Sequence, residues 1–363
     1  MRILVALSGG IDSSVVAHLL HKEGHELIGV RFTLWSDPLA PAIAEILPSK
    51  CCNAQTAARA KSVAKSLNIP LHILDLEREF KATVVDPFLD GYARGLSPNP
   101  CIGCNRTLKF GSLIAFADSL GCEKLATGHY ARVEEEITPQ GTVRYSLHEA
   151  ADPKKDQSYY LYGLSQNALS RVLFPLGSKA KKDVYSLAKD FGIPLPEYYR
   201  ESQDLCFFPE KTPTKFLQRH LTSAMSQGTI VRKDGTVVGV HKGLPLYTVG
   251  QRRGLGIGGL RVPLEVVSKN VKSNELCVEE KGATLVSDIH LSDLHFIASP
   301  PEKGIPHSLE CRLRSLSSRL SGTLTITDEH GTFRLHTPVP PQAPGQSLVL
   351  YAGSEVIGGG VMV

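Results

Sequence analysis

The sequence predicts an α/β protein in which a doubly wound parallel sheet comes first and a C-terminal antiparallel β-barrel comes last. Between them lies a small central segment that lacks the alternation of strand and helix patterns. Three observations predict this order. Strand and helix patterns alternate through the first part of the chain, which favours parallel pairing. This alternation ends near residue 200. Beyond about residue 275, short alternating apolar runs dominate, as expected of a small barrel.

The elements of the parallel sheet follow from apolar spacing and from stop signals. Gly24 ends the first expected helix, and Asn68 with Pro70 ends the second. Strands are expected at residues 3–7, 27–33, 71–76 and 124–127, and helices at 13–23, 54–67 and 113–120. Ligands of such a sheet bind at the carboxyl ends of its strands.

The C-terminal strands are marked by period-two alternation. They are expected at residues 323–327, 332–335, 348–351 and 356–363, with a turn at 328–331 between the first two. Between this region and the sheet lies a glycine-rich run at 250–259 that matches G-x-G-x-x-G. It follows no β-α-β opening and precedes Pro263 rather than a helix, so a Rossmann dinucleotide site is rejected there.

Composition places the chain among ordinary globular proteins. Its 363 residues favour two or three domains, and 42% apolar with 21% charged residues excludes a disorder-dominated class. No signal-peptide pattern opens the sequence, and no run of 18 apolar residues occurs, so a cytoplasmic protein without a membrane span is expected. Eight cysteines in a reducing compartment favour chemistry or packing over disulfides. A net charge of +4 permits a polyanionic partner without requiring one.

The segment 8–14, Ser-Gly-Gly-Ile-Asp-Ser-Ser, joins the first strand to the first helix. Its glycines let the backbone approach an anion, and the first N–H groups of a helix point at it, so the loop predicts a phosphate site. Asp12 is expected to hold Mg²⁺ or to cap the helix. The alternative is a turn that merely needs glycine.

The loop lacks the spacing and the lysine of a Walker P-loop, so hydrolysis at the γ-phosphate is not favoured. The pattern S-G-G-x-D-S instead resembles the ATP pyrophosphatase loop. That resemblance implies cleavage of ATP between the α- and β-phosphates and adenylation of an acceptor.

The cysteines form one short motif and several isolated positions. Cys101 and Cys104 form a C-x-x-C in a segment that reads as a turn-rich loop, compatible with zinc, an iron–sulfur cluster or redox exchange. Cys206, between polar and aromatic residues, reads by itself as a buried small hydrophobe. The adjacent pair Cys51 and Cys52 stays ambiguous.

The chain resembles the tRNA-specific 2-thiouridylase family, which places sulfur on the wobble uridine of certain tRNAs. The likeness runs nearly end to end, and several separate motifs in one order are more specific than any one of them. The segments that carry it are 8–14, 99–105, 126–130, 155–161, 202–208, 250–259 and 344–346.

The resemblance implies a three-part architecture. An ATP pyrophosphatase domain would span residues 1–200, a small central tRNA-binding domain 201–275 and a C-terminal antiparallel β-barrel 276–363. It also implies tRNA as substrate, ATP with Mg²⁺ as cofactor, and a sulfur-donor protein, either a cysteine desulfurase or a sulfur-relay protein, as partner.

Residue roles are carried over position by position. The catalytic pair would be Cys104 and, as the persulfide carrier, Cys206. The expected ATP contacts are Ala6, Leu7, Ser8, Gly9, Gly10, Ile11, Asp12, Ser13, Phe32 and Gly128. The target base would lie against Asn99, Pro100 and Cys101, and the expected tRNA contacts are His129, Lys155, Asp156, Gln157, Arg314, Ser315 and Gln346.

The chemistry of the reaction supports these roles. The C2 carbonyl of uridine is a poor electrophile, so attaching AMP to O2 supplies a leaving group that sulfur can displace. A persulfide ionises readily and is a strong nucleophile at neutral pH. Cys104 would then attack the Cys206 sulfur and free the thiolated base, or would first release hydrosulfide from the persulfide. Both routes need the two thiols over one extruded base.

Cys101 departs from the family pattern, because many members have an acid–base aspartate there. One hypothesis is that Cys101, Cys104 and Cys206 ligate a [4Fe-4S] cluster with one iron open to hydrosulfide. The other is that Cys101 simply replaces the aspartate in an intact persulfide route.

Scattered basic residues could form a phosphate-contacting surface, but the solvated-face interpretation is favoured for them. They are Lys179, Lys181, Lys182, Arg252, Arg253, Arg312, Arg314 and Arg319.

Two other functions also stay open. An amidotransferase-type adenylating synthetase would not need Cys104 or Cys206, and a metal-stabilised RNA-binding module would leave the 8–14 loop unexplained.

Overall fold

A parallel sheet forms the N-terminal part of the chain, whose computed structural model describes residues 1–41, 54–194, 205–259 and 262–363. The strand order is β3-β2-β1-β4-β7, and every neighbouring pair is parallel. The strands are β1 (Arg2–Ala6), β2 (Glu26–Thr33), β3 (Leu71–Asp75), β4 (Lys124–Ala126) and β7 (Val172–Leu173). The predicted strands of this sheet are confirmed to within one or two residues.

Helices cover both faces of this sheet. Alternate residues of β1 point to opposite sides, so Ile3 and Val5 pack in one buried cluster while Leu4 packs in another. The first cluster is covered by α1 (Ile11–Lys22), α2 (Ala54–Ser66) and α8 (Lys181–Asp190), and the second by α6 (Leu113–Ser119) and α7 (Gln166–Arg171). The doubly wound prediction is therefore confirmed.

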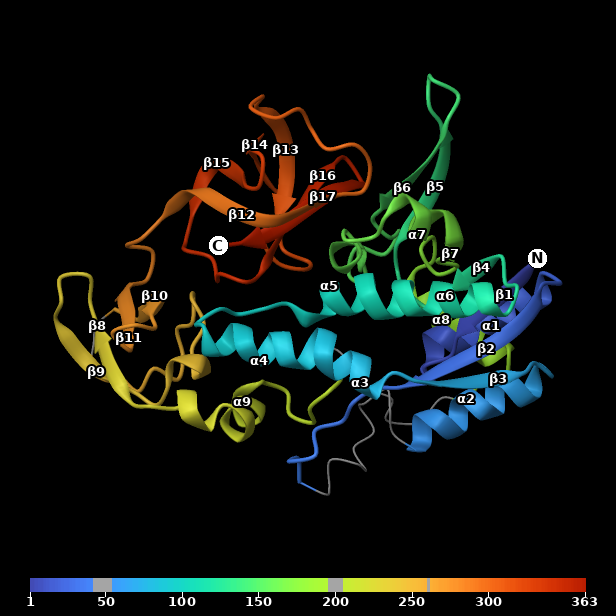
Figure 1. Cartoon of the computed structure of the whole chain (residues 1–363), viewed down its shortest axis with the longest axis horizontal. Helices are drawn as coiled ribbons and strands as arrows, with labels where there is room; N and C mark the ends of the chain where they lie inside the picture. The colour runs from blue at the N-terminus through green and yellow to red at the C-terminus, as the bar shows by residue number, and fades with distance from the viewer. Residues whose placement is uncertain (42–53, 195–204, 260–261) are drawn as a thin grey trace.

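Two helical rods run side by side next to the sheet (Figure 1). One joins α3 (Glu77–Phe80) to α4 (Asp86–Ala93) through a π-helical stretch at Lys81–Val85. The other joins α5 (Pro100–Cys104) to α6 through a π-helical stretch at Asn105–Ser112. The expectation of a turn-rich loop around the C-x-x-C was therefore wrong.

The local sequence explains the start of α5. The Asn99 side chain accepts a hydrogen bond of 3.3 Å from the Cys101 N–H, and Pro100 occupies the first helical position, where its missing N–H costs nothing. Cys101 and Cys104 thus lie one helical turn apart, on the same side of the rod.

The middle of the chain carries a smaller mixed sheet. Its order is β10-β11-β8-β9, with β11 and β8 parallel and the other neighbours antiparallel. The strands are β8 (Gly228–Val231), β9 (Val237–His241), β10 (Leu264–Asn270) and β11 (Glu275–Glu280). Helix α9 (Thr214–His220) precedes this sheet and packs on the α3–α4 rod, where Phe216 contacts Phe88.

The C-terminal strands close into an antiparallel barrel, as predicted, because β12 pairs with both β15 and β17. They are β12 (Val286–Phe296), β13 (His307–Arg312), β14 (Leu320–Ile326), β15 (Gly331–Val339), β16 (Ser347–Ala352) and β17 (Glu355–Met362). A hairpin from the first part of the chain, β5 (Arg132–Ile137) and β6 (Val143–His148), extends the barrel sheet through pairing of β6 with β17. The sequence pattern did not predict this pairing.

A buried ion network also joins the barrel to the N-terminal part. Arg312 pairs with Glu149 at 2.8 Å and with Asp156 at 3.0 Å, and Arg319 pairs with Glu149. Both guanidinium groups lie over the ring of Tyr351. The solvated-face interpretation was therefore wrong for Arg312 and Arg319.

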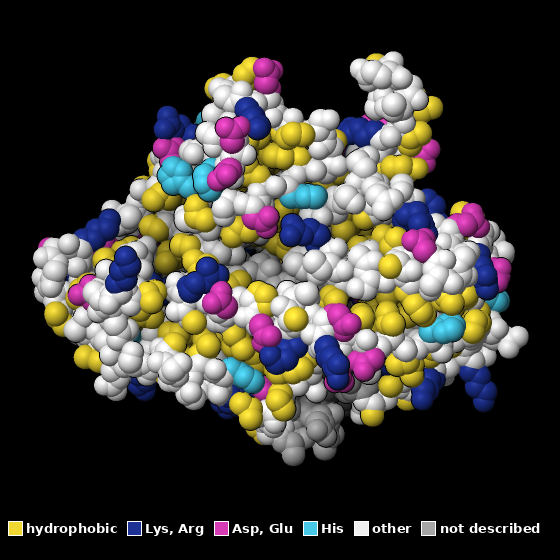
Figure 2. All heavy atoms as spheres, in the orientation of Figure 1, with side chains coloured by type: hydrophobic (Ala, Val, Ile, Leu, Met, Phe, Trp, Pro, Cys, Tyr) yellow, Lys and Arg dark blue, Asp and Glu magenta, His cyan; other side chains and the backbone are white. Residues whose placement is uncertain are grey.

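Among the described residues, none of the helices has the length and apolar character needed to cross a bilayer. The face seen in Figure 2 carries basic and acidic side chains interspersed over all three lobes. No continuous patch of basic side chains covers that face, which agrees with the small net charge of +4.

Candidate functional site

A cavity of about 370 Å³ lies where β1, β2 and β4 end. This is the edge at which ligands of a parallel sheet are expected. Its lining includes the strand ends Ala6 and Phe32, the residues Thr127 and Gly128 after β4, and the three cysteines of the predicted site. We call it the nucleotide–thiol cavity.

The glycine-rich loop forms part of the wall of this cavity. Gly10 is the N-cap of α1, and Gly9 adopts a left-handed φ of +78°. A Cβ at position 9 would lie 2.1 Å from the carbonyl oxygen of Thr56, so only glycine fits between the loop and α2. Hydroxyls of Ser13 and Ser14 donate to the Gly10 carbonyl at 3.1 and 2.9 Å, which fixes the turn.

The predicted ATP contacts divide into two groups. Leu7 and Ile11 are buried in the core, and Gly9 is closed off against α2. The others line the nucleotide–thiol cavity, namely Ala6, Ser8, Gly10, Asp12, Ser13, Phe32 and Gly128. The sequence alone could not make this distinction, because it depends on which way each residue of the loop faces.

Asp12 is held by two partners from distant segments. Its carboxylate accepts hydrogen bonds from the Lys181 ammonium at 2.7 and 2.9 Å and from the Tyr130 hydroxyl at 2.8 Å. The capping role expected for Asp12 was wrong, because α1 begins at Ile11 and places the carboxylate in the first turn. Lys181 already supplies a positive charge to this carboxylate, so we place no metal ion there.

Lys181 is a correction to the sequence-based interpretation. The solvated-face interpretation included it, but it is 7% exposed and lines the cavity from the start of α8. Its burial is stabilised by the ion pair with Asp12. No spacing in the sequence connects positions 12 and 181, so only the fold could show the pair.

The cavity carries an excess of positive charge. Arg59, Lys109, Lys155 and Lys181 line it, whereas Asp12 is its one acidic residue among those the structure describes. Arg59 also donates to the Gly9 carbonyl at 2.8 Å and so braces the loop. Arg59 and Lys109 were missed by sequence reasoning, because single basic residues on helices give no distinctive signal. An excess of fixed positive charge in a concave site favours a polyphosphate.

The three thiols also line this cavity. Cys101 and Cys104 come from α5, whereas Cys206 comes from a segment anchored by the buried ring of Phe207. Phe207 packs edge-on against Phe80 and Phe88 of the α3–α4 rod, in the same apolar cluster that contains Cys104. The fold therefore brings Cys104 and Cys206 to one cavity from distant positions in the sequence.

Burial affects the protonation of two residues that line the cavity, Cys101 and His129. It raises the pKa of the Cys101 thiol to about 11, with the Lys109 ammonium acting in the opposite direction, so Cys101 is protonated at neutral pH. Burial also holds the pKa of His129 well below its usual value, and Lys109 lowers it further. His129 is therefore neutral, with Nδ1 at 2.7 Å from the Thr127 hydroxyl.

The predicted substrate contacts are also divided by the structure. Pro100, Cys101, His129, Lys155 and Gln157 line the nucleotide–thiol cavity. The Asp156 carboxylate is instead buried and bonded to Arg312. The Gln346 side chain donates to the Ser97 carbonyl, and Arg314 and Ser315 follow β13 in a turn of the barrel.

Metal-binding geometry can be judged for the described residues, which exclude Cys51 and Cys52. Among these described residues, only one group of three His, Cys, Asp or Glu side chains has its ligand atoms within 4.8 Å of one another. This group is Glu134, Glu136 and His148 on the β5–β6 hairpin. Arg132 and Arg144 already pair with these glutamates. The three thiols of the cavity do not form such a group, so as placed they do not chelate a single ion.

Three family models match consecutive parts of the chain. Their descriptions are the tRNA methyl transferase HUP domain over residues 1–210, the tRNA methyl transferase PRC-barrel domain over 214–280 and the aminomethyltransferase β-barrel domain over 286–362. The first of these alone spans more than half of the chain.

Curated relatives match along almost the whole length. The chain is 38% identical to the tRNA-specific 2-thiouridylase MnmA of Symbiobacterium thermophilum, over 99% of this chain and 92% of the relative. It is 39% identical to that of Geobacter metallireducens, over 99% and 96%. A solved U34-tRNA thiolase, NcsA from Methanococcus maripaludis with its [4Fe-4S] cluster, covers 55% of this chain and 61% of its own. With 17% identity and a TM-score of 0.32, that likeness supports no assignment of residues.

Proposed function

Because the chain belongs to the tRNA-specific 2-thiouridylase family and is thus a tRNA sulfurtransferase, we propose that it thiolates the wobble uridine in the nucleotide–thiol cavity. The observation that carries this proposal is the lining of one cavity by both the Ser8–Ser13 loop and the cysteines 101, 104 and 206. A nucleotide and a sulfur nucleophile can therefore meet at one base. The description of the family model that matches residues 1–210 names a tRNA methyl transferase. However, a glycine-rich loop that lines the same cavity as the thiols favours a reaction that consumes ATP.

The first step we propose is activation of the base by ATP. The uridine O2 attacks the α-phosphate, pyrophosphate leaves, and AMP becomes attached to O2. Arg59, Lys155 and Lys181 would neutralise the phosphates, and the N-terminus of α1 would stabilise the charge that develops on them. Asp12 would act on this step indirectly, by holding the ammonium group of Lys181 in place.

The second step transfers sulfur. The terminal sulfur of a Cys206 persulfide attacks C2, and AMP leaves with the former carbonyl oxygen. The Cys104 thiolate then attacks the Cys206 sulfur, which breaks the S–S bond and releases the 2-thiouridine. A Cys104–Cys206 disulfide remains, and an external thiol must reduce it before the next turnover. We further propose that a sulfur-donor protein reloads the persulfide.

Cys101 has two proposed roles that differ in the sulfur carrier. As a protonated thiol it would lie against the base in place of an aspartate. In the alternative, Cys101, Cys104 and Cys206 would hold an iron–sulfur cluster, for which thiolates are the usual ligands. Such a cluster would supply an open iron site for hydrosulfide. The mechanism above uses only the thiols.

Release of pyrophosphate tests the proposal. We expect the purified chain to convert ATP to AMP and pyrophosphate at least about tenfold faster with a tRNA that has uridine at the wobble position. The matched control is the same tRNA with 2-thiouridine already at that position, which has no O2 left to adenylate. An ATP turnover rate that does not depend on the tRNA, or release of the γ-phosphate as inorganic phosphate, would contradict the proposal.

A further inference from the structure

Four ionic side chains form a cluster where α9 meets the first part of the chain. Helix α9 supplies Arg219 and His220. Asp37 comes from the extension of β2, and Glu210 comes from the segment that carries Cys206. We call Asp37, Glu210, Arg219 and His220 the Arg219 clamp. None of these four residues lines the nucleotide–thiol cavity, and the mechanism proposed above does not use them.

Arg219 bridges two carboxylates. Its Nη1 donates to Oε1 of Glu210 at 2.6 Å and its Nη2 donates to Oε2 at 3.2 Å, while its Nε donates to Oδ2 of Asp37 at 3.0 Å. The two-fold contact with Glu210 is one that a planar guanidinium makes and a lysine ammonium does not. The side chains of Arg219 and Glu210 are only 18% and 17% exposed, so solvent screens this pair less than it screens a surface pair.

Asp37 is the buried end of the clamp. Its side chain is 1% exposed, and its carboxylate also accepts hydrogen bonds from His220 Nε2 at 2.7 Å and from the Leu39 N–H at 2.9 Å. Burial by itself would raise the pKa of Asp37, but the hydrogen bonds from His220 and Arg219 bring it below its ordinary value. The carboxylate therefore stays ionised at neutral pH and holds the guanidinium of Arg219 from one side.

The same face of α9 also contacts aromatic residues of both segments. Phe216 lies one helical turn before the two clamp residues of α9, so it shares their face of the helix. Its ring stacks on Phe208 at 4.9 Å between centroids and meets Trp35 edge-on at 6.4 Å. The segment that carries Cys206 and the extension of β2 thus each make one ionic and one aromatic contact with a single helix.

The two segments that α9 joins are also walls of the nucleotide–thiol cavity. The β2 side lines it with Phe32 and Leu34, and the other segment lines it with Cys206 and the residue on either side of it. Phe32 is an expected ATP contact, and Cys206 is the expected persulfide carrier. The clamp therefore ties the wall expected to face the nucleotide to the wall expected to carry the sulfur.

We propose that Arg219 is a positioning residue for sulfur transfer, which holds Cys206 within reach of the activated base by binding Glu210. This inference rests on the proposed function. Residues 205–213 belong to no helix or strand, so side-chain contacts have to fix the place of the thiol. The attacking sulfur must come within about 3 to 3.5 Å of C2, and a small displacement is costly in rate. Adenylation uses groups on other segments and does not depend on Glu210.

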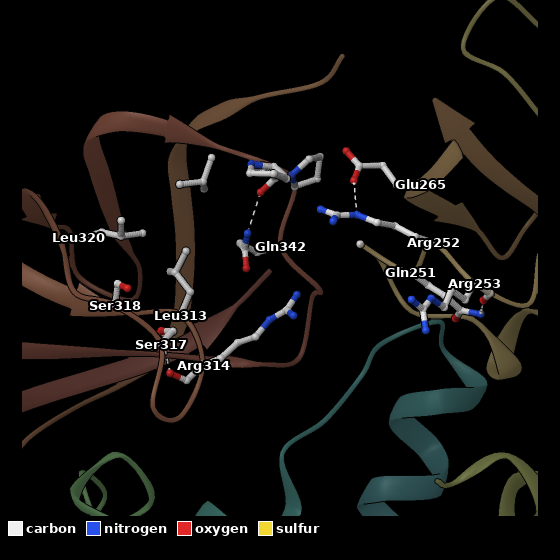
Figure 3. A pocket seen from close by; sticks show the side chains of 14 residues that line it. Gln251, Arg252, Arg253, Glu265, Leu313, Arg314, Ser317, Ser318, Leu320 and Gln342 are labelled. Atoms are coloured by element: carbon white, nitrogen blue, oxygen red, sulfur yellow. Dashed lines mark hydrogen bonds and ion pairs between the residues drawn. The ribbon is translucent and has the colours of Figure 1, made fainter. Parts of the chain in front are cut away.

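The clamp is separate from the surface that the resemblance implies for tRNA. Arg314, one of those implied contacts, lines a second cavity of about 720 Å³ between the middle sheet and the barrel. Arg252 and Arg314 extend toward this cavity from opposite walls (Figure 3). None of the four clamp residues lines it. A change in the clamp should therefore leave the affinity for tRNA unaltered.

Glu210→Gln tests this inference, because it removes the ionic bond to the segment of Cys206 and leaves Arg219 paired with Asp37. Glutamine has nearly the same size as glutamate, so the fold should persist. The first measurement is the equilibrium in which oxidised glutathione is reduced to two glutathione molecules while Cys104 and Cys206 lose two protons and two electrons and form a disulfide. Mass spectrometry of the linked peptide gives the effective concentration of one thiol at the other, which we expect to fall about tenfold.

The second measurement separates the two chemical steps in a single turnover. Sulfur transfer by Glu210→Gln should fall about tenfold, whereas tRNA-dependent pyrophosphate release and the KM for tRNA should change less than about twofold. The matched control is Glu310→Gln. Arg319 pairs with both Glu310 and Glu149, so this control also removes one of two carboxylates from a bridging arginine, but in the barrel. It should leave the disulfide equilibrium and both chemical steps unchanged.

A second variant guards against a purely structural effect. Arg219→Lys should match Glu210→Gln in both measurements, because an ammonium group does not hold two carboxylates in this geometry. The double variant should be no worse than the poorer single one, since both changes break the same contact.

The outcomes separate this inference from the proposed function. If Glu210→Gln and Arg219→Lys keep the wild-type disulfide equilibrium and rate of sulfur transfer, Arg219 does not position Cys206. Equal losses of pyrophosphate release and sulfur transfer would also overturn the inference, because they would assign the clamp to the fold as a whole. A wild type that does not thiolate tRNA refutes the proposed function, whereas the disulfide equilibrium still reports whether Arg219 holds the two thiols together.

Discussion

Replacing Cys206 with serine is expected to lower thiolation of tRNA by at least about 10³-fold while adenylation of the bound tRNA continues. A serine hydroxyl cannot carry the terminal sulfur, but it is close in size to the thiol that it replaces beside the buried Phe207. The loop that we propose to bind ATP comes from a distant part of the sequence and is not altered. Pyrophosphate release and nucleoside analysis on the same sample measure the two steps separately.

Cys277→Ser is the control, because Cys277 is a partly buried thiol in β11 that does not line the cavity. It should thiolate tRNA at nearly the wild-type rate.

Cys104→Ser distinguishes the two release routes. If Cys104 acts after sulfur attack, this variant accumulates a covalent tRNA adduct on Cys206 that a thiol reductant releases. If Cys104 first frees hydrosulfide, no adduct forms. Retained thiolation in Cys206→Ser would contradict the persulfide assignment.

The second large effect is expected from Gly9→Ala. The added methyl carbon would lie 2.1 Å from the Thr56 carbonyl oxygen, and the left-handed φ of +78° adds about 1 kcal/mol of strain. Because this carbonyl belongs to the backbone of α2, the loop must move rather than a flexible side chain. A displacement of about 1 Å at a reacting group costs about 100-fold in rate. We therefore expect tRNA-dependent pyrophosphate release to fall by about that factor.

Gly24→Ala is the matched control for backbone strain. Gly24 follows α1, has a φ of +81°, and has no atom within 4 Å of the place that a Cβ would occupy. The left-handed conformation should cost Gly24→Ala about as much stability as it costs Gly9→Ala. Pyrophosphate release by Gly24→Ala should be unchanged. Urea unfolding of both variants separates the two effects. Equal activity of Gly9→Ala and wild type would show that the loop does not position the nucleotide.

Local patterns in the sequence predicted the regular elements well. Strands β1, β2 and β3 and helices α1 and α2 combine clear apolar spacing with glycine, asparagine or proline stops, so their positions agree closely with the structure. The barrel strands β14 and β15 were visible because their buried residues alternate with more exposed ones around a short turn. Strands β16 and β17 are more continuously buried and were visible as short apolar runs. In each case the signal lies within a few neighbouring residues.

Long-range contacts were beyond the reach of such patterns. The hairpin β5–β6 looks local, yet it pairs with β17 through Val356 and Leu147. The pairing of Asp12 with Lys181 and the buried position of Asp156 likewise depend on how distant segments pack. Helix α5 was missed for a local reason, since Pro100 and Gly103 suggest a turn, whereas the Asn99 cap makes Pro100 a helix start.

The central claim is that a single chain exchanges the O2 oxygen of a wobble uridine for sulfur at one cavity. Mass spectrometry of nucleosides tests it most directly, after the purified chain has reacted with unmodified tRNA, ATP, a thiol reductant and an enzyme that generates persulfide from cysteine. We expect 2-thiouridine to form at the wobble position, in an amount that matches the AMP released, and to be absent when ATP is withheld. Formation of AMP without any sulfur-containing nucleoside would contradict the account.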